Sequence, residues 1–531
     1  EKENRYMRLM NRVIKPGVKT KVLMLSATPV NNRFYDLRNQ LALAYEGDPS
    51  EFNEKLNIKS DIDTIFRQAQ KVYNAWCKLP EKERTTATLL SQLDFDFFEV
   101  LDSVTIARSR KHIQTYYDVA DIGNFPKRNK PISLRPKLTT RPNAINYKEV
   151  YELLSKLHLT IYTPTAFIQP SKLQKYLSED ETEKFRSGRE LGIQWLMSIN
   201  LLKRMESSVH SFLLTVKRIY DYLYDTSHAI DDFIATGASN LNEMPDLSSE
   251  ADEFDYDDQN TDFFNVGKKV KIDLRDMDYI SWKREMDEDI DNLQLLILMI
   301  EDITPEYDFK LNELIRIIRE KATAPINPGN KKILIFTAFS DTAEYLYENI
   351  SGMALKELGL HTALVTGSVD GKTTISKFKP DMNHVLACFS PKSKDRDVLY
   401  PRDKTDIDIL IATDCISEGQ NLQDCDYCVN YDIHWNPVRI IQRFGRIDRI
   451  GSKNAVIQLV NFWPDLDLDE YINLKSRVET RMRISVMTST GDDDLINQEE
   501  KGDLEYRRSQ LKKLQEEVVD LEDMTNGISI M

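Results

Sequence analysis

Two arginines and a glutamine close to residue 445 have the spacing of a phosphate-contacting group. If residues 440–449 are helical, Gln442, Arg446 and Arg449 occupy positions i, i+4 and i+7 and share one face. An arginine guanidinium is planar, permanently charged and able to hold phosphate oxygens in pairs. Two such groups beside a glutamine suit the charge that develops on a transferred γ-phosphoryl group. A solvated basic face is the alternative explanation of this pattern.

The segments that precede these arginines predict how they are held. Residues 407–412 form an apolar run with the length of a strand buried on both faces, and Thr413 and Asp414 end it. A polar turn around residues 418–419 follows, and then a second apolar run at 427–431. This order of strand, polar turn, strand and helix favours a functional interpretation of the arginines over a solvated face.

Several short motifs in order carry a family resemblance. QRFGRIDR at 442–449 resembles motif VI of superfamily-two helicases, and TDCISEGQNL at 413–422 resembles motif V. The Glu-Gly-x-Asn-Leu form and the Trp-Asn-Pro step are similar to the Swi/Snf branch of DNA-dependent ATPases, and GRIDRIG resembles its bacterial members. KVLMLSATPVNN at 21–32, which predicts a buried strand, resembles motif III, and KILIFTAFS at 332–340 resembles motif IV.

The resemblance implies an α/β fold with a complete second RecA-like motor lobe on a parallel sheet, a partial first lobe and a large all-helical insertion. ATP would lie between the lobes, with Arg446 and Arg449 approaching its γ-phosphate and Gln442 orienting the nucleotide or the attacking water. Further cofactor contacts are implied for Asp414, Glu418, Gly419 and Arg443. Nucleic-acid contacts are implied for Ser26, Thr28, Arg108, Arg110, Lys111, Thr337, Thr366, Gly367, Thr413 and Asn421.

The resemblance also predicts that part of the motor lies elsewhere. In this family a Gly-rich phosphate loop and an acidic magnesium-binding box precede motif III, but only 25 residues precede Ser26. The chain is therefore expected to be a fragment that is inactive alone, with ATP as cofactor and Mg²⁺ held upstream. TGSVDGKT at 366–373 nearly spells a phosphate loop but has Thr366 in place of the first glycine, so we interpret it as a turn facing nucleic acid.

Composition decides little about partners. The net charge of −15 is not typical of a nucleic-acid binder, but a densely acidic loop at 243–262 lowers it without affecting a basic groove elsewhere. Five cysteines do not make a disulfide framework in a chain of this size, and packing explains the Cys425-x-x-Cys428 pair better than half a zinc site does. With no membrane-spanning run and no signal peptide, the sequence predicts a cytoplasmic protein without a membrane partner.

The resemblance, together with the helical periodicity and the proline-rich stretches, implies five domains. Residues 1–45 are the end of the first lobe, 46–130 a helical region whose basic element closes that lobe, and 131–305 the helical insertion. Residues 306–480 are the second lobe and 481–531 a C-terminal helical brace. Within the insertion, apolar residues recurring every three or four positions predict one long amphipathic helix over 193–224. Four prolines between 126 and 142 predict an extended linker.

The sequence thus predicts the C-terminal part of an ATP-dependent translocase or remodeller that moves on double-stranded DNA. Two alternatives stay open: a strand-separating DNA or RNA helicase, and a module whose insertion docks a protein such as RNA polymerase or a defence nuclease.

Overall fold

The computed structural model describes residues 5–17, 21–25, 34–48, 60–76, 79, 86–104, 113, 117–118, 122–176, 194, 197–237, 273–367, 371–416, 419–434 and 437–464. The chain divides into two compact units. One comprises Glu1–Phe125, His434–Gln442 and Leu474–Met531, and the other comprises Pro126–Ile433 and Arg443–Asn473. The acidic loop and the predicted C-terminal brace lie outside the described residues.

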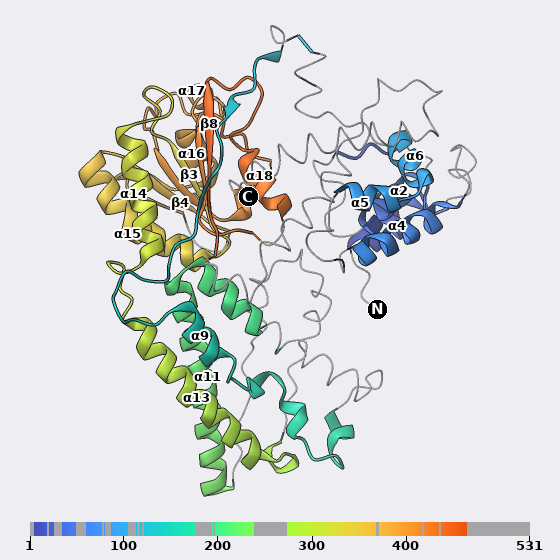
Figure 1. Ribbon diagram of the computed structural model, residues 1–531, viewed down its shortest axis with the longest axis vertical. Coiled ribbons are helices and arrows are strands. Elements are labelled where there is room, and N and C mark those ends of the chain that lie inside the picture. The colour runs from blue at the N-terminus through green and yellow to red at the C-terminus, as the bar shows by residue number, and fades with distance from the viewer. Residues whose placement is uncertain are drawn as a thin grey trace. The chain divides into compact units, whose positions relative to one another are not determined.

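The second unit is built on a largely parallel sheet (Figure 1). Its strands lie in the order β1-β8-β7-β3-β6-β4-β5, and β2 also pairs with β8. Every pairing is parallel except that of β4 with β5. The strands are β1 (Lys127–Arg128), β2 (Ile132–Leu134), β3 (Ile333–Phe336), β4 (Thr362–Val365), β5 (Lys372–Thr373), β6 (Ile409–Ala412), β7 (Tyr427–Asn430) and β8 (Val456–Phe462).

The central strands form because short apolar runs are buried on both faces, as in sheets covered by helices on each side. Ile335 of β3 is in register with Ile411 of β6 on one side and Val429 of β7 on the other. The predicted α/β fold with a parallel sheet is confirmed. The helices of this part are α14 (Phe309–Thr323), α15 (Ser340–Leu358), α16 (Met382–Phe389) and α17 (Arg396–Leu399). Helix α18 (Pro437–Phe444) begins among residues of the first unit, and its last two residues belong to the second.

Two strands come from the proline-rich stretch at 126–142, where the sequence indicated only an extended linker. Lys127 pairs with Val456 and Ile132 pairs with Val460, so this stretch extends the sheet along β8. Among the bonds that fix it, the Lys127 N–H donates to the Ala455 carbonyl oxygen at 2.8 Å. A stretch that the sequence placed before the second lobe therefore belongs to the sheet of that lobe.

A helical hairpin projects from the sheet in the same unit (Figure 1). Helices α11 (Val209–Thr236) and α13 (Tyr279–Glu301) pack along each other, and α9 (Tyr147–Leu154) lies against α13. The prediction of one continuous helix over 193–224 is wrong. A helical segment at 197–207 ends before Ser208, whose backbone is extended. The Ser208 side chain then caps α11 by accepting a hydrogen bond from the Ser211 N–H at 3.0 Å.

The described part of the first unit is helical. Helices α2 (Phe34–Ala44), α4 (Ile62–Trp76), α5 (Thr86–Gln92) and α6 (Phe95–Val104) enclose a core in which the Phe34 and Phe97 rings meet edge to face at 4.8 Å. At its start, α1 (Arg5–Leu9) continues into a π-helical turn. The buried strand predicted from residue 21 is wrong for the described residues 21–25. Leu23 and Leu25 are 84% and 90% exposed, and no strand of this unit's described residues pairs with them.

No helix in the described ranges combines the length and the apolar character needed to cross a bilayer.

Candidate functional site

Polar residues gather where the parallel strands of the second unit end. Thr337 follows β3, Thr366 follows β4, Thr413 and Asp414 follow β6, and Asp432 follows β7 by two residues. The carboxyl ends of parallel strands share one edge of a sheet, and ligands of open α/β folds bind at that edge. The sequence placed its motif residues at this edge, and the strand order brings the β3, β6 and β7 ends next to each other.

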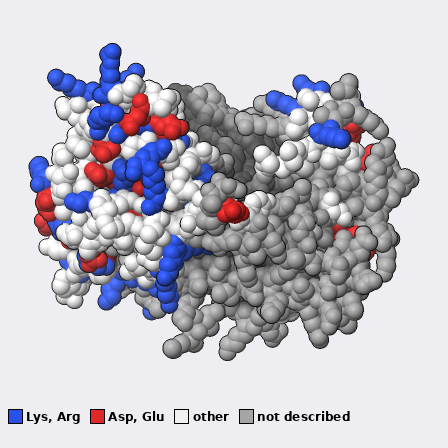
Figure 2. Space-filling view, turned by 90° about the horizontal axis from the view of Figure 1, so that it is seen from above, with Lys and Arg blue, Asp and Glu red and all other residues white. Residues whose placement is uncertain are grey.

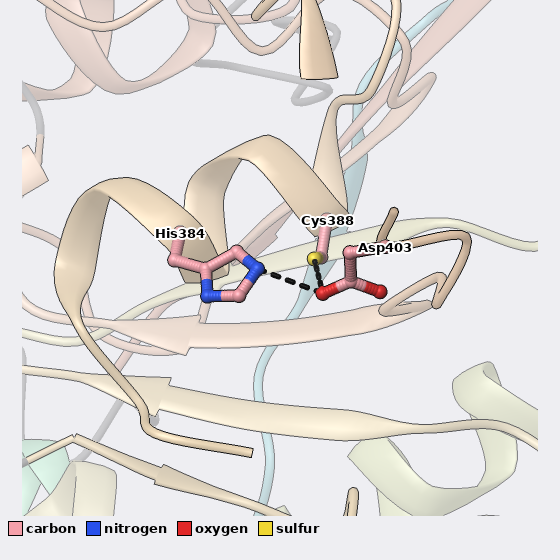
Figure 3. Close-up of side chains that lie close together, drawn as sticks. All are labelled: His384, Cys388 and Asp403. Carbon is pink, nitrogen blue, oxygen red and sulfur yellow. Dashed lines mark hydrogen bonds and ion pairs between the residues drawn. The ribbon is translucent and has the colours of Figure 1, made fainter. Parts of the chain in front are cut away.

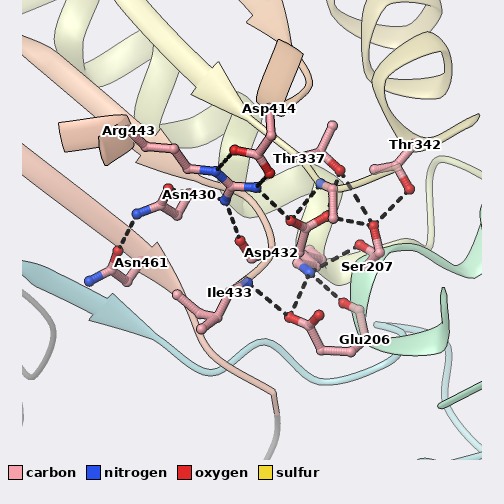
Figure 4. Close-up of polar contacts among 12 residues, drawn as sticks. Glu206, Ser207, Thr337, Thr342, Asp414, Asn430, Asp432, Ile433, Arg443 and Asn461 are labelled. Carbon is pink, nitrogen blue, oxygen red and sulfur yellow. Dashed lines mark hydrogen bonds and ion pairs between the residues drawn. The ribbon is translucent and has the colours of Figure 1, made fainter. Parts of the chain in front are cut away.

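An arginine–carboxylate pair ties the end of β6 to α18. The Arg443 guanidinium donates from Nε to Asp414 Oδ1 at 2.7 Å and from Nη2 to Asp414 Oδ2 at 2.6 Å, which is a bidentate ion pair (Figure 4). Its Nη1 also donates to Asn430 Oδ1 and to the Asp432 carbonyl oxygen. Burial alone would lower the pKa of Arg443, but the neighbouring carboxylates raise it, so the buried group stays charged.

The Arg443 side chain is fully buried, and Nε, Nη1 and Nη2 of its guanidinium each donate to a protein acceptor. The sequence assigned cofactor contacts to Arg443 and Asp414. The geometry instead makes them each other's partner, so they position the surrounding segments and do not present a free guanidinium to a ligand.

Asp432 is the centre of a second buried group (Figure 4). Its Oδ2 accepts from the hydroxyls of Thr337 at 2.5 Å and Ser207 at 2.7 Å, and its Oδ1 accepts from the Ala338 N–H at 2.8 Å. Its Oδ1 also lies 3.9 Å from Nη2 of Arg443. Since Asp432 is 1% exposed, this carboxylate is satisfied wholly by the protein.

Through Ser207 the network includes the helical insertion. Ser207 Oγ lies 2.8 Å from Thr342 Oγ1, and Ser208 Oγ lies 2.9 Å from the same atom. Lys310 donates to the Ser207 carbonyl oxygen at 3.0 Å, and Arg204 forms an ion pair with Asp341 at 2.9 Å. The end of the 197–207 helical segment is therefore fixed to the strand ends by buried hydrogen bonds.

Glu206 adds a buried carboxyl group to this joint. Burial raises its pKa from the ordinary value of 4.5 to about 8, although the nearby Lys310 ammonium acts in the opposite direction. Lys310 Nζ lies 3.9 Å from Glu206 Oε1, and the Ile433 N–H donates weakly to the same oxygen at 3.5 Å. A group that changes charge near neutral pH thus lies at the contact between insertion and sheet.

Arg446 holds the motif V turn. Its Nη1 donates to the Gln420 carbonyl oxygen at 2.9 Å, and its own carbonyl oxygen accepts from the Leu422 N–H at 3.0 Å. Lys394 donates to the Gln420 side chain, and burial followed by the nearby Arg446 charge lowers the pKa of Lys394. Arg446 is 7% exposed, so in this conformation it fastens the turn at 420–422.

Arg449 differs from Arg446 in its surroundings. Its side chain is exposed, and no hydrogen bond or ion pair of that side chain is found within the part of the chain that the structure describes. Gln442, half-buried in α18, accepts weakly from Arg439 Nη1 at 3.5 Å. Of the three residues assigned to catalysis, Arg449 is the one whose guanidinium is available to an incoming anion.

The prediction of a continuous helix through Arg449 is wrong. Helix α18 ends at Phe444, and the chain then tightens into turns in which the Arg446 N–H donates to the Arg443 carbonyl oxygen at 3.2 Å. Gly445, the next residue, is a poor helix former. Arg446 and Arg449 therefore do not share a helix face with Gln442, and the i, i+4, i+7 argument fails for them.

The other assigned residues divide into buried, exposed and undescribed groups. Thr337 is fully buried with its hydroxyl bonded to Asp432, and its nucleic-acid contact stays a prediction. Thr413 is buried, Thr366 and Asn421 are half-buried, and Gly367 and Gly419 are exposed. Gly419 has φ of +70°, a backbone conformation that suits glycine in this turn. Ser26, Thr28, Arg108, Arg110, Lys111 and Glu418 lie outside the described residues.

One basic residue at the start of the sheet is paired with an acid. Arg128 of β1 donates from Nε to Asp448 Oδ2 at 2.8 Å. On the face in Figure 2, described Lys and Arg side chains are interspersed with Asp and Glu. The described residues seen there therefore form no unbroken basic field.

Sequence reasoning missed Asp432, Ser207, Glu206 and Lys310. Asp432 follows an apolar strand run just as Asp414 does, so the rule that located Asp414 could have located it. The other three meet the site only through the docking of the insertion, and no local pattern indicates that contact.

The comparisons with known proteins agree with this geometry in one region. Residues 310–451, which include β3, β4, β6, β7 and α18, match the family described as "Helicase conserved C-terminal domain". That part of the chain is a helicase C-terminal domain.

Similar proteins cover short stretches. An uncharacterized ATP-dependent helicase, YqhH of Bacillus subtilis, is 52% identical over 50 residues, which is 9% of each chain. The DEAD-box ATP-dependent RNA helicase RhpA of Helicobacter pylori is 23% identical over 31% of this chain and 28% of its own. The putative ATP-dependent DNA helicase fml2 of Schizosaccharomyces pombe is 27% identical over 28% and 17%. The chain thus spans less than a third of the length of each relative.

Among solved structures, the C-terminal part of the Fun30 ATPase domain aligns with 75% of this chain and 99% of its own. The sequence identity is 14% and the TM-score is 0.27.

Proposed function

We propose that this chain supplies the second RecA-like lobe of an ATP-dependent motor that translocates on double-stranded DNA. The observation that carries the proposal is the carboxyl edge of the sheet, where the Arg443–Asp414 pair braces motif V against motif VI while Arg449 stays exposed. The brace fixes the motif VI segment that carries Arg449. Electrostatic stabilisation of the charge that develops on a γ-phosphate requires such a preorganised group.

In this proposal ATP binds where the first, phosphate-binding lobe meets this edge, and that first lobe also holds Mg²⁺. Arg449 reaches the γ-phosphate. Arg446 keeps the turn at 420–422 in place, and the exposed Gly419 and Gly367 let a nucleic-acid backbone approach the edge closely. Closure of the lobes on ATP and opening after hydrolysis would move the protein along the duplex.

The test uses a protein that joins both lobes. ATP turnover stimulated by duplex DNA, together with displacement of a triplex-forming strand, supports translocation. Turnover accompanied by strand separation and no triplex displacement would replace translocation by helicase activity, which the DNA and RNA helicases among the similar proteins keep as the competing function. Absence of any nucleotide turnover would overturn the motor proposal itself.

A second candidate function is a docking module for a protein partner, with RNA polymerase or a defence nuclease as the partners to test. It is favoured by Leu295 and Leu298 of α13, which lie at i and i+3 and are 48% and 60% exposed. Changing both to Asp should abolish co-purification of such a partner without lowering turnover. If the partner is retained by this variant, the hairpin is not its docking surface.

A further inference from the structure

Away from the strand ends, three side chains with different donor atoms converge beside α16 (Figure 3). His384 and Cys388 stand at i and i+4 of this helix, so both project from one face. Asp403 reaches them from the loop that precedes β6. One nitrogen, one sulfur and one oxygen ligand atom lie within 4.8 Å of each other.

The carboxylate is held so that one oxygen faces the other two side chains. Asp403 Oδ1 accepts from the Thr405 N–H at 2.8 Å, which leaves Oδ2 directed at the pair on the helix. Oδ2 lies 2.7 Å from His384 Nε2 and 3.7 Å from Cys388 Sγ. A hydrogen-bonded carboxylate with one free oxygen is the usual state of an oriented metal ligand.

The imidazole is also fixed. Its ring stacks on Tyr400 with centroids 4.2 Å apart and packs against Phe378 at 4.4 Å. The Cys388 side chain is buried, whereas the side chains of His384 and Asp403 are 23% and 21% exposed. The sulfur is therefore shielded from solvent while the other two ligands leave a path for an ion.

We propose that His384, Cys388 and Asp403 bind one zinc ion with a fourth position open to solvent. Zn²⁺ is bound by imidazole nitrogen, thiolate sulfur and carboxylate oxygen, and tetrahedral coordination separates such ligand atoms by roughly 3.3–3.6 Å. Asp403 Oδ2 lies closer to His384 Nε2 and slightly farther from Cys388 Sγ than this range, and all three ligand atoms lie within 4.8 Å of one another, so binding of the ion requires small movements of these side chains. Coordination releases the thiol proton of Cys388.

Bound zinc would tie the segment at 391–406, which includes α17, to α16. That segment contains Lys394, which contacts the Gln420 side chain in the motif V turn. The site is separate from the proposed nucleotide edge, so zinc binding and ATP turnover are tested independently.

The test is zinc binding by residues 1–531. After exposure to Zn²⁺ and removal of excess ion, elemental analysis should find one zinc per chain, and Cys388→Ser and Asp403→Asn should each lose it. With Co²⁺ as probe, wild type should show the near-ultraviolet absorption of a cobalt–thiolate bond, and Cys388→Ser should not.

Two matched variants serve as controls. His158 lies 3.3 Å from Asp289 and 3.8 Å from Glu288, and no three-ligand group includes it among the described residues, so His158→Asn should keep the zinc. Cys415→Ser removes an exposed thiol and should also keep it.

Thermal unfolding separates a misfolded variant from a lost site. In chelator, Cys388→Ser should unfold at the temperature of wild type, and added Zn²⁺ should raise the midpoint of wild type only. Zinc that is absent from wild type, or retained in equal amount by Cys388→Ser, would show that the cluster is an ion pair beside a buried thiol and overturn the proposal.

Discussion

Replacing Asp432 by Ala tests whether the helical insertion is joined to the motor motifs. The substitution removes the acceptor of three hydrogen bonds, from Thr337, Ser207 and the Ala338 N–H. The two hydroxyls can turn toward each other or toward Thr342, but the Ala338 N–H has no such alternative. An unsatisfied buried donor and a weakened charge pair together cost about 2–4 kcal/mol.

Hydrogen exchange is the assay because a chain with two compact units need not unfold in one step. A local loss of about 3 kcal/mol corresponds to roughly 10²-fold faster exchange. We expect that increase in peptides covering 197–207 and in peptides covering 333–339, because both contact Asp432. Asp432→Asn, which can still accept from the Ala338 N–H, should give an increase of only about tenfold or less.

The matched control is Asp289→Ala. Asp289 is another buried carboxylate, and it accepts from the backbone N–H groups of His158 and Leu159 at 2.7 Å each. Its loss should speed exchange around 157–160 and leave 333–339 protected. If Asp432→Ala speeds exchange at 333–339 and leaves 197–207 unchanged, the insertion is not coupled to the strand ends and the reasoning is refuted.

Two further predictions concern charge at the joint and the division of the motor. Because the pKa of Glu206 is raised from 4.5 to about 8, the folded state binds the proton more tightly than the unfolded state, so this group's contribution to stability is full below pH 4.5 and declines as pH rises to 8. In denaturant titrations Glu206→Gln should therefore gain stability over wild type across that window, reaching on the order of 5 kcal/mol by pH 8, and a difference independent of pH would contradict this. Residues 1–531 alone should show no ATP turnover stimulated by DNA. Measurable turnover would show that no separate phosphate-binding lobe is required.

The sheet was predictable because its central strands are apolar runs buried on both faces. Residues 407–412 and 427–431 carry that signal. The polar residues after each run could be predicted as site residues because ligands of such sheets bind at the carboxyl ends of the strands. Strands β1 and β2 were not predictable in the same way. They are two and three residues long and partly exposed, and they exist because β8 offers an edge.

The roles of the motif residues were harder to predict than their location. Periodicity placed Arg446 and Arg449 on one helix face, but the helix ends at Phe444 and the two guanidinium groups have different surroundings. Arg443 fits a phosphate site by residue type, and Asp414 lies at the end of a strand, where ligands collect. Only the folded chain shows that they are bonded to each other and buried.

The most direct test of the central claim is the rate of DNA-stimulated ATP hydrolysis by Arg449→Ala in a protein that joins both lobes, with DNA affinity measured beside it. Lys453→Ala, the loss of an exposed cation four residues further on, is the matched control. We expect Arg449→Ala to lower turnover by about 10³-fold with DNA affinity nearly unchanged, and Lys453→Ala to leave both unaltered. Turnover of Arg449→Ala equal to that of the parent protein would contradict the assignment of this arginine to the γ-phosphate.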